Sequence, residues 1–259
     1  MKRLVIYTCI TGGYDTLPDP SAVCPYIDYV CFTDSPTPVT EGVWEFRPLS
    51  RRERTATLTS RWHKLHPHEL FPDCEYTLWI DGNVTIADVR LYDRLESMMT
   101  SGVTIAGLRH PSRDDVYEEA LRILHGRRET LPNVMNTARF LRREGMPRHF
   151  GLYESNVILR RHGDPGVIAF DNLWWDMLHR FSGRDQLSQT YCLWKTGLSY
   201  DLILPDGSNV RNHPFFGYTL HGPVYVKQKT VKGRLRDAST AFNEMIFKLW
   251  GRLSGVVLR

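Results

Sequence analysis

The stretch YTLWIDGN, residues 76–83, decides the fold of this 259-residue chain. Its first five residues are apolar or β-branched, which predicts a strand buried on both faces. The strand runs directly into Asp81, Gly82 and Asn83, which are typical turn residues. Residues 4–10 and 29–33 repeat this pattern. Because ligands of open α/β sheets collect at the carboxyl ends of the strands, the sequence predicts an α/β domain with its site there.

Composition favours a single folded domain. Hydrophobic residues make up 42% of the chain and charged residues 24%, as in ordinary globular proteins. The net charge of +4 is low for a nucleic-acid binder, so no nucleic-acid partner is expected. The five cysteines are an odd number without CxxC spacing, which predicts reduced thiols and a cytoplasmic location.

The start MKRLVIYTCI resembles a signal peptide, but its apolar run stops after seven residues without a small-residue cleavage site. We therefore expect a first strand there. The chain contains no run of about 18 apolar residues, so a transmembrane helix is not expected.

Further elements follow from local patterns. Strands are predicted at residues 103–108, 151–160 and 200–204, and helices at 115–145 with an interruption near Pro132, at 170–181, and after Gln186. Residues 50–65 carry five Arg or Lys residues and lack Gly and Pro, which predicts an exposed basic helix ended by Pro67. Trp174 and Trp175 are expected in the core.

Residues 226–259 form a predicted basic tail, distinct from a domain at 1–225. Five cations fall within ten residues: Lys227, Lys229, Lys232, Arg234 and Arg236. Four apolar residues then recur at helical spacing: Phe242, Ile246, Leu249 and Leu253. Such an amphipathic helix can dock on a membrane surface, here the inner face, or it can pack on the domain as a terminal helix.

Asp81, Gly82 and Asn83 form a DxD-like arrangement. A carboxylate and a second oxygen donor beyond a buried strand can hold one divalent ion, and glycine lets a diphosphate approach the backbone. The same tripeptide also makes ordinary turns. The three residues by themselves leave both interpretations open.

Several unusual short sequence motifs occur in one order along the chain: ITGGYD (10–15), YVCFTDS (29–35), KLHPHELFP (64–72), YTLWIDGN (76–83), HPSRDDVYEEA (110–120), GLYESNVILRRH (151–162) and RDQLS (184–188). This order resembles the GT-A-like, TOD1/MUCI70-type family that includes plant glycosyltransferase candidates for mucilage and pectin. The resemblance is collinear from residue 5 to about residue 212.

The resemblance implies a Rossmann-like GT-A fold, with a central, mostly parallel sheet flanked by helices. It also implies a nucleoside-diphosphate sugar as donor, with Mn²⁺ or Mg²⁺ bridging the diphosphate. The ends of the first two strands would hold the nucleoside through Thr11, Gly12, Tyr14 and Asp34, although each is also a turn-forming residue. Lys64 would neutralise phosphate charge.

Arg113 and Asp114 are the candidates for holding the donor sugar, and the alternative is a helix N-terminus at Asp114 and Asp115. Asp185 and Gln186 are the candidates for the reacting centre. Asp185 would act as general base in an inverting enzyme, or would stabilise an oxocarbenium-like state in a retaining one. Its alternative is a helix N-cap.

The acceptor is predicted to contact Glu154 and Asn156, which alternate along a strand with Ser155 on the opposite face. Because Asn83 is a neutral ligand, a third metal ligand is expected. His221-Gly222 with Lys227 resembles the late metal-binding motif of glycogenin-like and lipopolysaccharide galactosyltransferases, so His221 is the candidate. His213 competes with it, and a structural role is the alternative.

The leading hypothesis is a cytoplasmic glycosyltransferase of polysaccharide biosynthesis, in a bacterial-type setting, acting on a glycan or lipid-linked glycan. A metal-dependent phosphohydrolase or nucleotidyltransferase would use the same carboxylate and cations. A catalytically silent glycan-binding domain is the third hypothesis, because Asn83 departs from the usual acidic pair.

Overall fold

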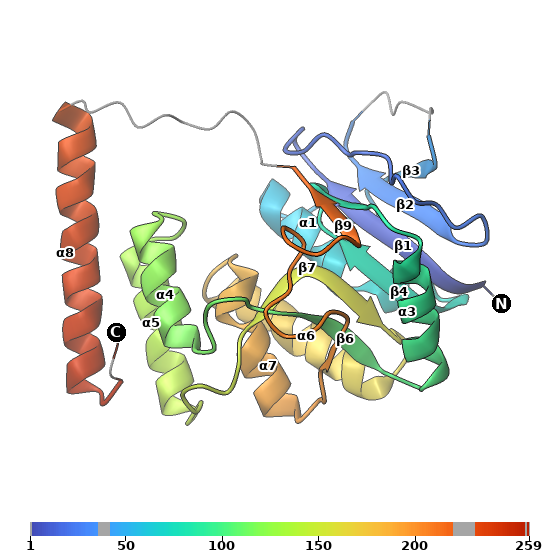
Figure 1. The fold of residues 1–259 in the computed structure, drawn as a ribbon. Helices are drawn as coiled ribbons and strands as arrows, with labels where there is room; N and C mark the ends of the chain where they lie inside the picture. The colour runs from blue at the N-terminus through green and yellow to red at the C-terminus, as the bar shows by residue number, and fades with distance from the viewer. Residues whose placement is uncertain (1, 36–41, 220–230, 257, 259) are drawn as a thin grey trace.

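The computed structural model describes residues 2–35, 42–219, 231–256 and 258 (Figure 1). Its main sheet has seven strands in the order β3-β2-β1-β4-β7-β6-β8. Their bounds are β1 Lys2–Ile10, β2 Asp28–Thr33, β3 Trp44–Pro48, β4 Cys74–Ile80, β6 Ile105–Arg109, β7 Tyr153–Arg160 and β8 Asp201–Leu202. A separate two-stranded sheet pairs β5 (Val84–Ile86) with β9 (Phe216–Tyr218).

The main sheet is mostly parallel. Strand β7 runs antiparallel to its neighbours β4 and β6, whereas the remaining neighbours pair in parallel. The half-sheet β3-β2-β1-β4 has the strand order of a nucleotide-binding Rossmann half. The predicted α/β class, with a mostly parallel sheet between helices, is confirmed.

Eight α-helices and one 3₁₀ turn accompany these strands in the described residues. The helices are α1 Ala56–Leu65, α2 Pro67–Leu70, α3 Arg90–Thr100, α4 Val116–His125, α5 Leu131–Arg143, α6 Pro165–Arg180, α7 Gln189–Thr196 and α8 Val231–Leu253, and the 3₁₀ turn η1 is Asp185–Leu187. Local caps explain several starts: the side chains of Thr55, Asp115 and Asp164 accept backbone N–H groups at the starts of α1, α4 and α6.

Two apolar cores lie on the two faces of the main sheet. Successive side chains of β1 alternate between them: Val5 and Tyr7 pack with residues of α1 and α6, and Leu4 and Ile6 pack with residues of α3. Both faces are therefore buried, which is why residues 4–10 read as one continuous apolar run. Trp174 of α6 is fully buried in the first core, as predicted.

The prediction of an exposed basic helix at residues 50–65 is wrong. Helix α1 begins at Ala56, where Thr55 Oγ1 accepts a hydrogen bond from the Leu58 N–H over 3.2 Å. Its last turn is buried, and Lys64 is fully enclosed. The helix does end before Pro67, which opens the short helix α2. The basic residues were misleading because two of them, Arg61 and Lys64, pair with carboxylates inside the protein.

Five elements were not predicted, among them the short helix α2, which begins at Pro67. Strand β3 carries the polar residues Glu45 and Arg47 and ends at Pro48, so it lacks an apolar run. Strands β5 and β9 have only three residues each and are stabilised by pairing with one another. Helix α3 did carry a signal, because Leu91, Leu95 and Met98 are buried at helical spacing.

Strand β7 contains an irregularity beside the cavity described below. Gly107 of β6 pairs with Ile158, and Leu108 pairs with Glu154, so three residues of β7 have no partner on β6. These residues, 155–157, form a bulge that redirects the local side chains.

Helix α8 packs on the domain, which was one of the two interpretations of the tail. Phe247 is fully buried in the first core together with Tyr117 of α4. Arg142 of α5 donates a hydrogen bond to the Ser254 carbonyl over 3.0 Å. Figure 1 shows α8 at one end of the molecule, beside α4 and α5. None of the helices traced here is both long enough and apolar enough to span a bilayer.

Gly107 offers a test of the packing at β6. A Cβ at this position would overlap Tyr200 Oη and lie 2.9 Å from the Val157 carbonyl oxygen. Gly107→Ala should therefore lower the free energy of unfolding by about 1–3 kcal/mol and the melting temperature by roughly 3–10 °C. Gly163→Ala is the matched control, because a Cβ there meets nothing within 4 Å. Thermal unfolding by circular dichroism checks both, and equal melting temperatures would contradict the packing described.

Candidate functional site

A cavity of about 580 Å³ lies at the carboxyl ends of β1 and β4. It is larger than two cavities of about 380 and 440 Å³ beside α8. Its lining comes from seven segments: Cys9, Ile10, Thr11, Tyr14 and Asp15; Ala56, Thr57, Ser60 and Arg61; Trp79, Asp81 and Gly82; Arg128 and Glu129; Glu154, Ser155 and Asn156; Gly183, Arg184, Asp185 and Gln186; and Arg211. The cavity therefore occupies the place that the strand pattern predicts for a ligand.

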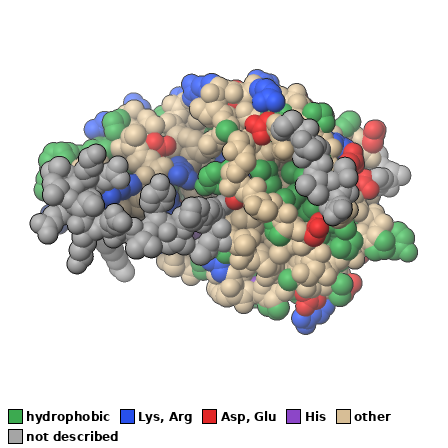
Figure 2. Space-filling model, turned by 90° about the horizontal axis from the view of Figure 1, so that it is seen from above, with side chains coloured by type: hydrophobic (Ala, Val, Ile, Leu, Met, Phe, Trp, Pro, Cys, Tyr) green, Lys and Arg blue, Asp and Glu red, His purple; other side chains and the backbone are tan. Residues whose placement is uncertain are grey.

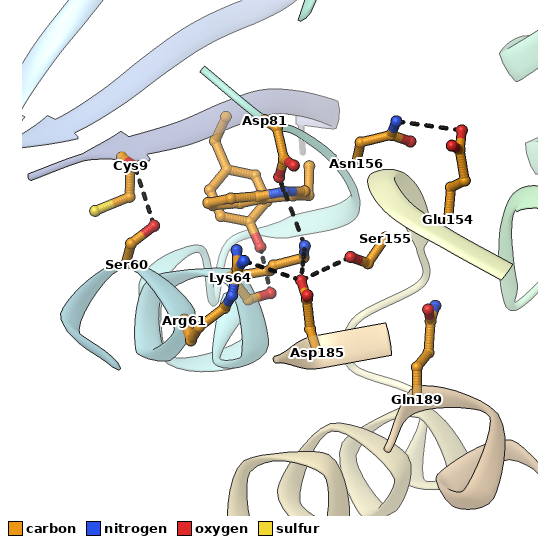
Figure 3. A network of polar contacts seen from close by, with 12 residues as sticks. Cys9, Ser60, Arg61, Lys64, Asp81, Glu154, Ser155, Asn156, Asp185 and Gln189 are labelled. Atoms are coloured by element: carbon orange, nitrogen blue, oxygen red, sulfur yellow. Dashed lines mark hydrogen bonds and ion pairs between the residues drawn. The ribbon is translucent and has the colours of Figure 1, made fainter. Parts of the chain in front are cut away.

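Lys64 connects the two carboxylates at the base of this cavity (Figure 3). Its Nζ lies 3.0 Å from Asp185 Oδ2 and 3.5 Å from Asp81 Oδ1. The side chain is fully buried, with its ammonium 5.4 Å from the Trp79 ring centroid. Burial lowers the pKa of Lys64 and outweighs the opposing effect of Asp81 and Asp185. One buried ammonium thus joins α1, the end of β4 and η1.

Asp185 accepts interactions from three side chains. Besides Lys64, Ser155 Oγ donates to Asp185 Oδ2 over 2.6 Å, and Arg61 Nη2 lies 3.2 Å from the same oxygen. Burial alone would raise the pKa of Asp185, but the charges of Arg61 and Lys64 and the Ser155 hydrogen bond hold this pKa well below its ordinary value. The carboxylate is ionised at any physiological pH.

The helix-cap interpretation of Asp185 is wrong. Asp185 opens the turn η1, but its side chain points to Lys64 and Ser155 and makes no cap hydrogen bond. Helix α7 begins at Gln189, beyond that turn. Gln186, the other residue predicted at the reacting centre, also lines the cavity.

Asp81 shares its edge of the cavity with Asp15. Asp81 Oδ1 accepts the Trp79 Nε1–H over 2.8 Å, and its side chain remains 28% exposed. A Cβ on Gly82 would lie 2.9 Å from the Ile10 side chain and 3.3 Å from Asp15 Cβ. Glycine at position 82 therefore lets the turn after β4 pack closely against the end of β1.

The structure does not bring Asp81 and Asn83 together as the predicted pair of metal ligands. Asn83 is buried, does not line the cavity, and donates through Nδ2 to the Thr219 carbonyl over 2.9 Å. Its role is to hold the chain after β9 against the turn after β4. His221, the predicted third ligand, lies outside the described residues. The competing candidate, His213, does not line the cavity.

The nucleoside candidates lie together at the ends of β1 and β2. Thr11 and Tyr14 line the cavity, and Tyr14 is 69% exposed. The Gly12 N–H donates to both Asp34 carboxylate oxygens, over 3.0 and 3.1 Å, with Gly12 at a φ of +64°. Asp34 thus ties the two strand ends to one another and does not itself line the cavity.

Arg113 and Asp114 lie elsewhere. Arg113 Nε donates to Glu119 Oε2 over 2.6 Å, and its Nη2 lies 3.0 Å from His110 Nε2. Asp114 is exposed and pairs with His149 over 2.8 Å. Neither residue lines the cavity, so their predicted contact with a donor sugar is not supported. The helix-terminus alternative holds for Asp115, whose carboxylate caps α4.

The acceptor candidates Glu154 and Asn156 do line the cavity. Asn156 Nδ2 donates to Glu154 Oε2 over 3.3 Å, and Arg211 Nη1 donates to Glu154 Oε1 over 2.9 Å. Ser155 turns the other way toward Asp185, as the alternation predicts, yet it still borders the same cavity.

Sequence reasoning missed several cations of the cavity. Arg61, Arg128, Arg184 and Arg211 come from four separate segments. Arg184 Nε donates to the Arg128 carbonyl over 2.9 Å, which joins two of these segments. Only Arg61 and Arg184 lay in or beside a recognised motif, so no signal in the sequence pointed to the other two.

Residues 48–204 match the family described as the TOD1/MUCI70 glycosyltransferase-like domain. The chain belongs to this family. The predicted family is thereby confirmed. A curated relative from Arabidopsis thaliana, "Probable hexosyltransferase MUCI70", is 33% identical over 134 residues. That match covers 48% of this chain and 23% of the plant protein, so this chain spans about a quarter of its relative.

Two solved structures are similar at a lower level. A galactosyltransferase, LgtC, in complex with donor and acceptor sugar analogs has a TM-score of 0.38 and 10% identity, covering 77% of this chain and 72% of that chain. The apo structure of the bifunctional glycosyltransferase WbbM has a TM-score of 0.43 and 9% identity, covering 93% of this chain and 44% of that chain.

Lys64→Met tests the buried charge network. It removes a fully buried cation and leaves Asp185 and Asp81 without that partner. Loss of one partner of a buried pair should lower the free energy of unfolding by about 3–5 kcal/mol, measured by urea unfolding at pH 7. The matched control is Lys195→Met, which removes a 48% exposed lysine bound to Glu144 and should cost under about 1 kcal/mol. Equal costs for the two variants would contradict the network.

Asp185 should also shape the acid limb of the stability curve. Because its native pKa is depressed, its ionised form contributes stability that is complete above the unfolded pKa of about 4 and is lost as the pH falls below it. Below about pH 4, the free energy of unfolding of the wild type should therefore fall more steeply than that of Asp185→Asn. Parallel curves from urea titrations across this range would show that Asp185 is not held by these cations.

Proposed function

We propose that this protein is a GT-A-type glycosyltransferase that moves a sugar from a nucleoside-diphosphate sugar to a hydroxyl of a glycan or lipid-linked glycan. The observation that carries the proposal is the cavity at the carboxyl ends of β1 and β4, which combines a fixed carboxylate, Asp185, with several cations. Membership of a glycosyltransferase-like family supports the same reaction class.

The cations suit a diphosphate leaving group. In the transfer, the bond from the anomeric carbon to the phosphate oxygen breaks, and a bond to the acceptor oxygen forms. Negative charge develops on the departing nucleoside diphosphate. Arg128 and Arg184 line the cavity and would offset that charge through planar, charge-assisted hydrogen bonds.

Asp185 suits an electrostatic role better than that of general base. An efficient base has a pKa near the working pH, whereas Arg61, Lys64 and Ser155 hold this carboxyl pKa far lower. A carboxylate that stays ionised can stabilise positive charge that develops on the sugar ring. In this proposal Asp185 faces the anomeric carbon, and the acceptor proton leaves to another group or to solvent.

A divalent ion fits the donor set in part. Among the residues placed in the structure, no three His, Cys, Asp or Glu side chains are arranged to hold a metal ion. Asp81 and Asp15 both line the cavity, and Mg²⁺ is commonly bound by one or two carboxylates together with substrate phosphates. Asp81 and Asp15 would therefore hold the ion. When bound, Mn²⁺ or Mg²⁺ would supply further charge compensation for the diphosphate.

The test is a thermal-shift screen of nucleoside-diphosphate sugars with and without Mn²⁺, followed by transfer assays with the stabilising donor. A ligand at about 100 times its Kd should stabilise by about 2.7 kcal/mol, or roughly 5–10 °C. Asp81→Ala should abolish the metal-dependent part of this shift. Asp185→Asn should keep donor binding and lose turnover.

Asp114→Ala is the control, because Asp114 lies outside the cavity and should be neutral in both assays. The proposal fails if no nucleotide sugar stabilises the wild type. Phosphate release that needs no acceptor would favour a phosphohydrolase instead.

A further inference from the structure

Four arginines surround a second cavity, of about 440 Å³, between α5, the end of α6 and α8. They are Arg139, Arg142, Arg143 and Arg180, and all four are exposed. The remaining lining residues are Asn136, Phe181, Trp250 and Ser254, so the lining contains no carboxylate. We call these four residues the arginine cluster.

The arginine cluster makes no close ion pair in the part of the chain that the structure describes, although Arg180 acts at longer range on Glu144. Arg142 donates to the Ser254 carbonyl, and the Arg180 guanidinium lies 5.2 Å from the Phe140 and Phe181 ring centroids. None of the four lies within ion-pair distance of a described carboxylate, in contrast to surface arginines such as Arg3 and Arg90. Guanidinium groups held together without carboxylates are well suited to binding phosphate oxygens.

An exposed apolar stripe runs along the same helix, α8. Phe242, Met245, Leu249 and Leu253 are 56%, 57%, 55% and 81% exposed and follow one another at helical spacing. They lie on the side of α8 away from the buried Phe247. In Figure 2, hydrophobic side chains gather at the edge of the molecule at which α8 lies in Figure 1.

The stripe and the arginine cluster meet at the last turns of α8. Trp250 and Ser254 line the cavity, and Leu249 and Leu253 are their chain neighbours in the stripe. Lys248 and Arg252, both exposed, add positive charge to these turns. Apolar side chains bordered by cations form the pattern of a helix that lies in a membrane interface.

We propose that this face of the protein, the stripe together with the arginine cluster, docks on a membrane of anionic phospholipid. The stripe enters the boundary between headgroups and acyl chains, and the arginine cluster binds headgroup phosphates. A soluble phosphate would account for the arginines and leave the apolar stripe unexplained. A cationic cavity without a carboxylate in its lining, next to an exposed apolar stripe, complements an anionic lipid surface in both charge and polarity.

Docking of this face would also place the catalytic cavity near the membrane. Arg180 of the cluster is separated from Asp185 by four residues, and two of these, Gly183 and Arg184, line the catalytic cavity. The docking proposal does not depend on the proposed reaction, because it is tested without substrate.

The experiment is flotation of the whole chain with vesicles of phosphatidylcholine, with and without phosphatidylglycerol. The wild type should float with anionic vesicles, less so as salt rises, and hardly at all with phosphatidylcholine alone. Arg139→Ala with Arg143→Ala should lower partitioning about 30-fold. Leu249→Ser with Leu253→Ser should lower it about tenfold or more.

The matched control is Arg52→Ala with Arg90→Ala, which removes two exposed arginines away from this face and should keep wild-type partitioning. Melting temperatures close to the wild type would show that each variant is folded. A loss of binding in the control equal to that of the cluster variant would reduce the effect to net charge and overturn the proposal.

Two further results would overturn it. In the first, inorganic phosphate stabilises the wild type but not the cluster variant, and the wild type does not bind vesicles. This result would assign the arginine cluster to a soluble phosphate. In the second, light scattering finds a dimer that becomes monomeric in the leucine variant, and neither protein binds vesicles. This result would assign the stripe to a second copy of this chain.

Discussion

The buried ammonium of Lys64 is the interaction on which the site depends. It brings Asp81, at the end of β4, and Asp185, in η1, to one point beneath the cavity. A lysine with no exposed surface is tolerable only when carboxylates compensate its charge, and the reverse holds for a carboxylate as deeply placed as Asp185. Each partner therefore fixes the others, and three segments far apart in the sequence are held in register.

The charges around the cavity are divided by function. At its base, Lys64, Arg61, Asp81 and Asp185 compensate one another and form a rigid, preorganised floor. Arg128 and Arg184 come from loops that line the cavity, where a ligand's phosphate can meet them. Catalysis by fixed charges works best when the charges are already in place before the reaction, because the protein then does not reorganise as charge develops.

Sequence reasoning located much of the site but misjudged several roles within it. Five of the predicted site residues do line one cavity, because they follow strands or belong to recognised sequence motifs: Asp81, Asp185, Gln186, Thr11 and Tyr14. Asn83 was wrongly assigned to the metal site, because spacing along a turn does not reveal that its side-chain amide donates to the Thr219 carbonyl. Arg113 and Asp114 were misplaced for a similar reason: Glu119 and His149 hold them away from the cavity. Lys64 was predicted to neutralise phosphate charge, but it is fully buried, does not line the cavity and pairs with Asp81 and Asp185 instead.

The sequence by itself determined the α/β class, the main strands and the family, because buried parallel strands are continuous apolar runs and ordered motifs are specific. Only the tertiary structure decided which polar groups meet. Arg128, Ser155 and Arg211 reach the cavity from separate segments, and the bulge of β7 includes Ser155 and Asn156, which both line it. Charge pairing between distant segments leaves no local period in the sequence. In the tail, the apolar spacing of α8 predicted a helix. Packing of α8 on α4 and α5 then decided which face of this helix was left exposed.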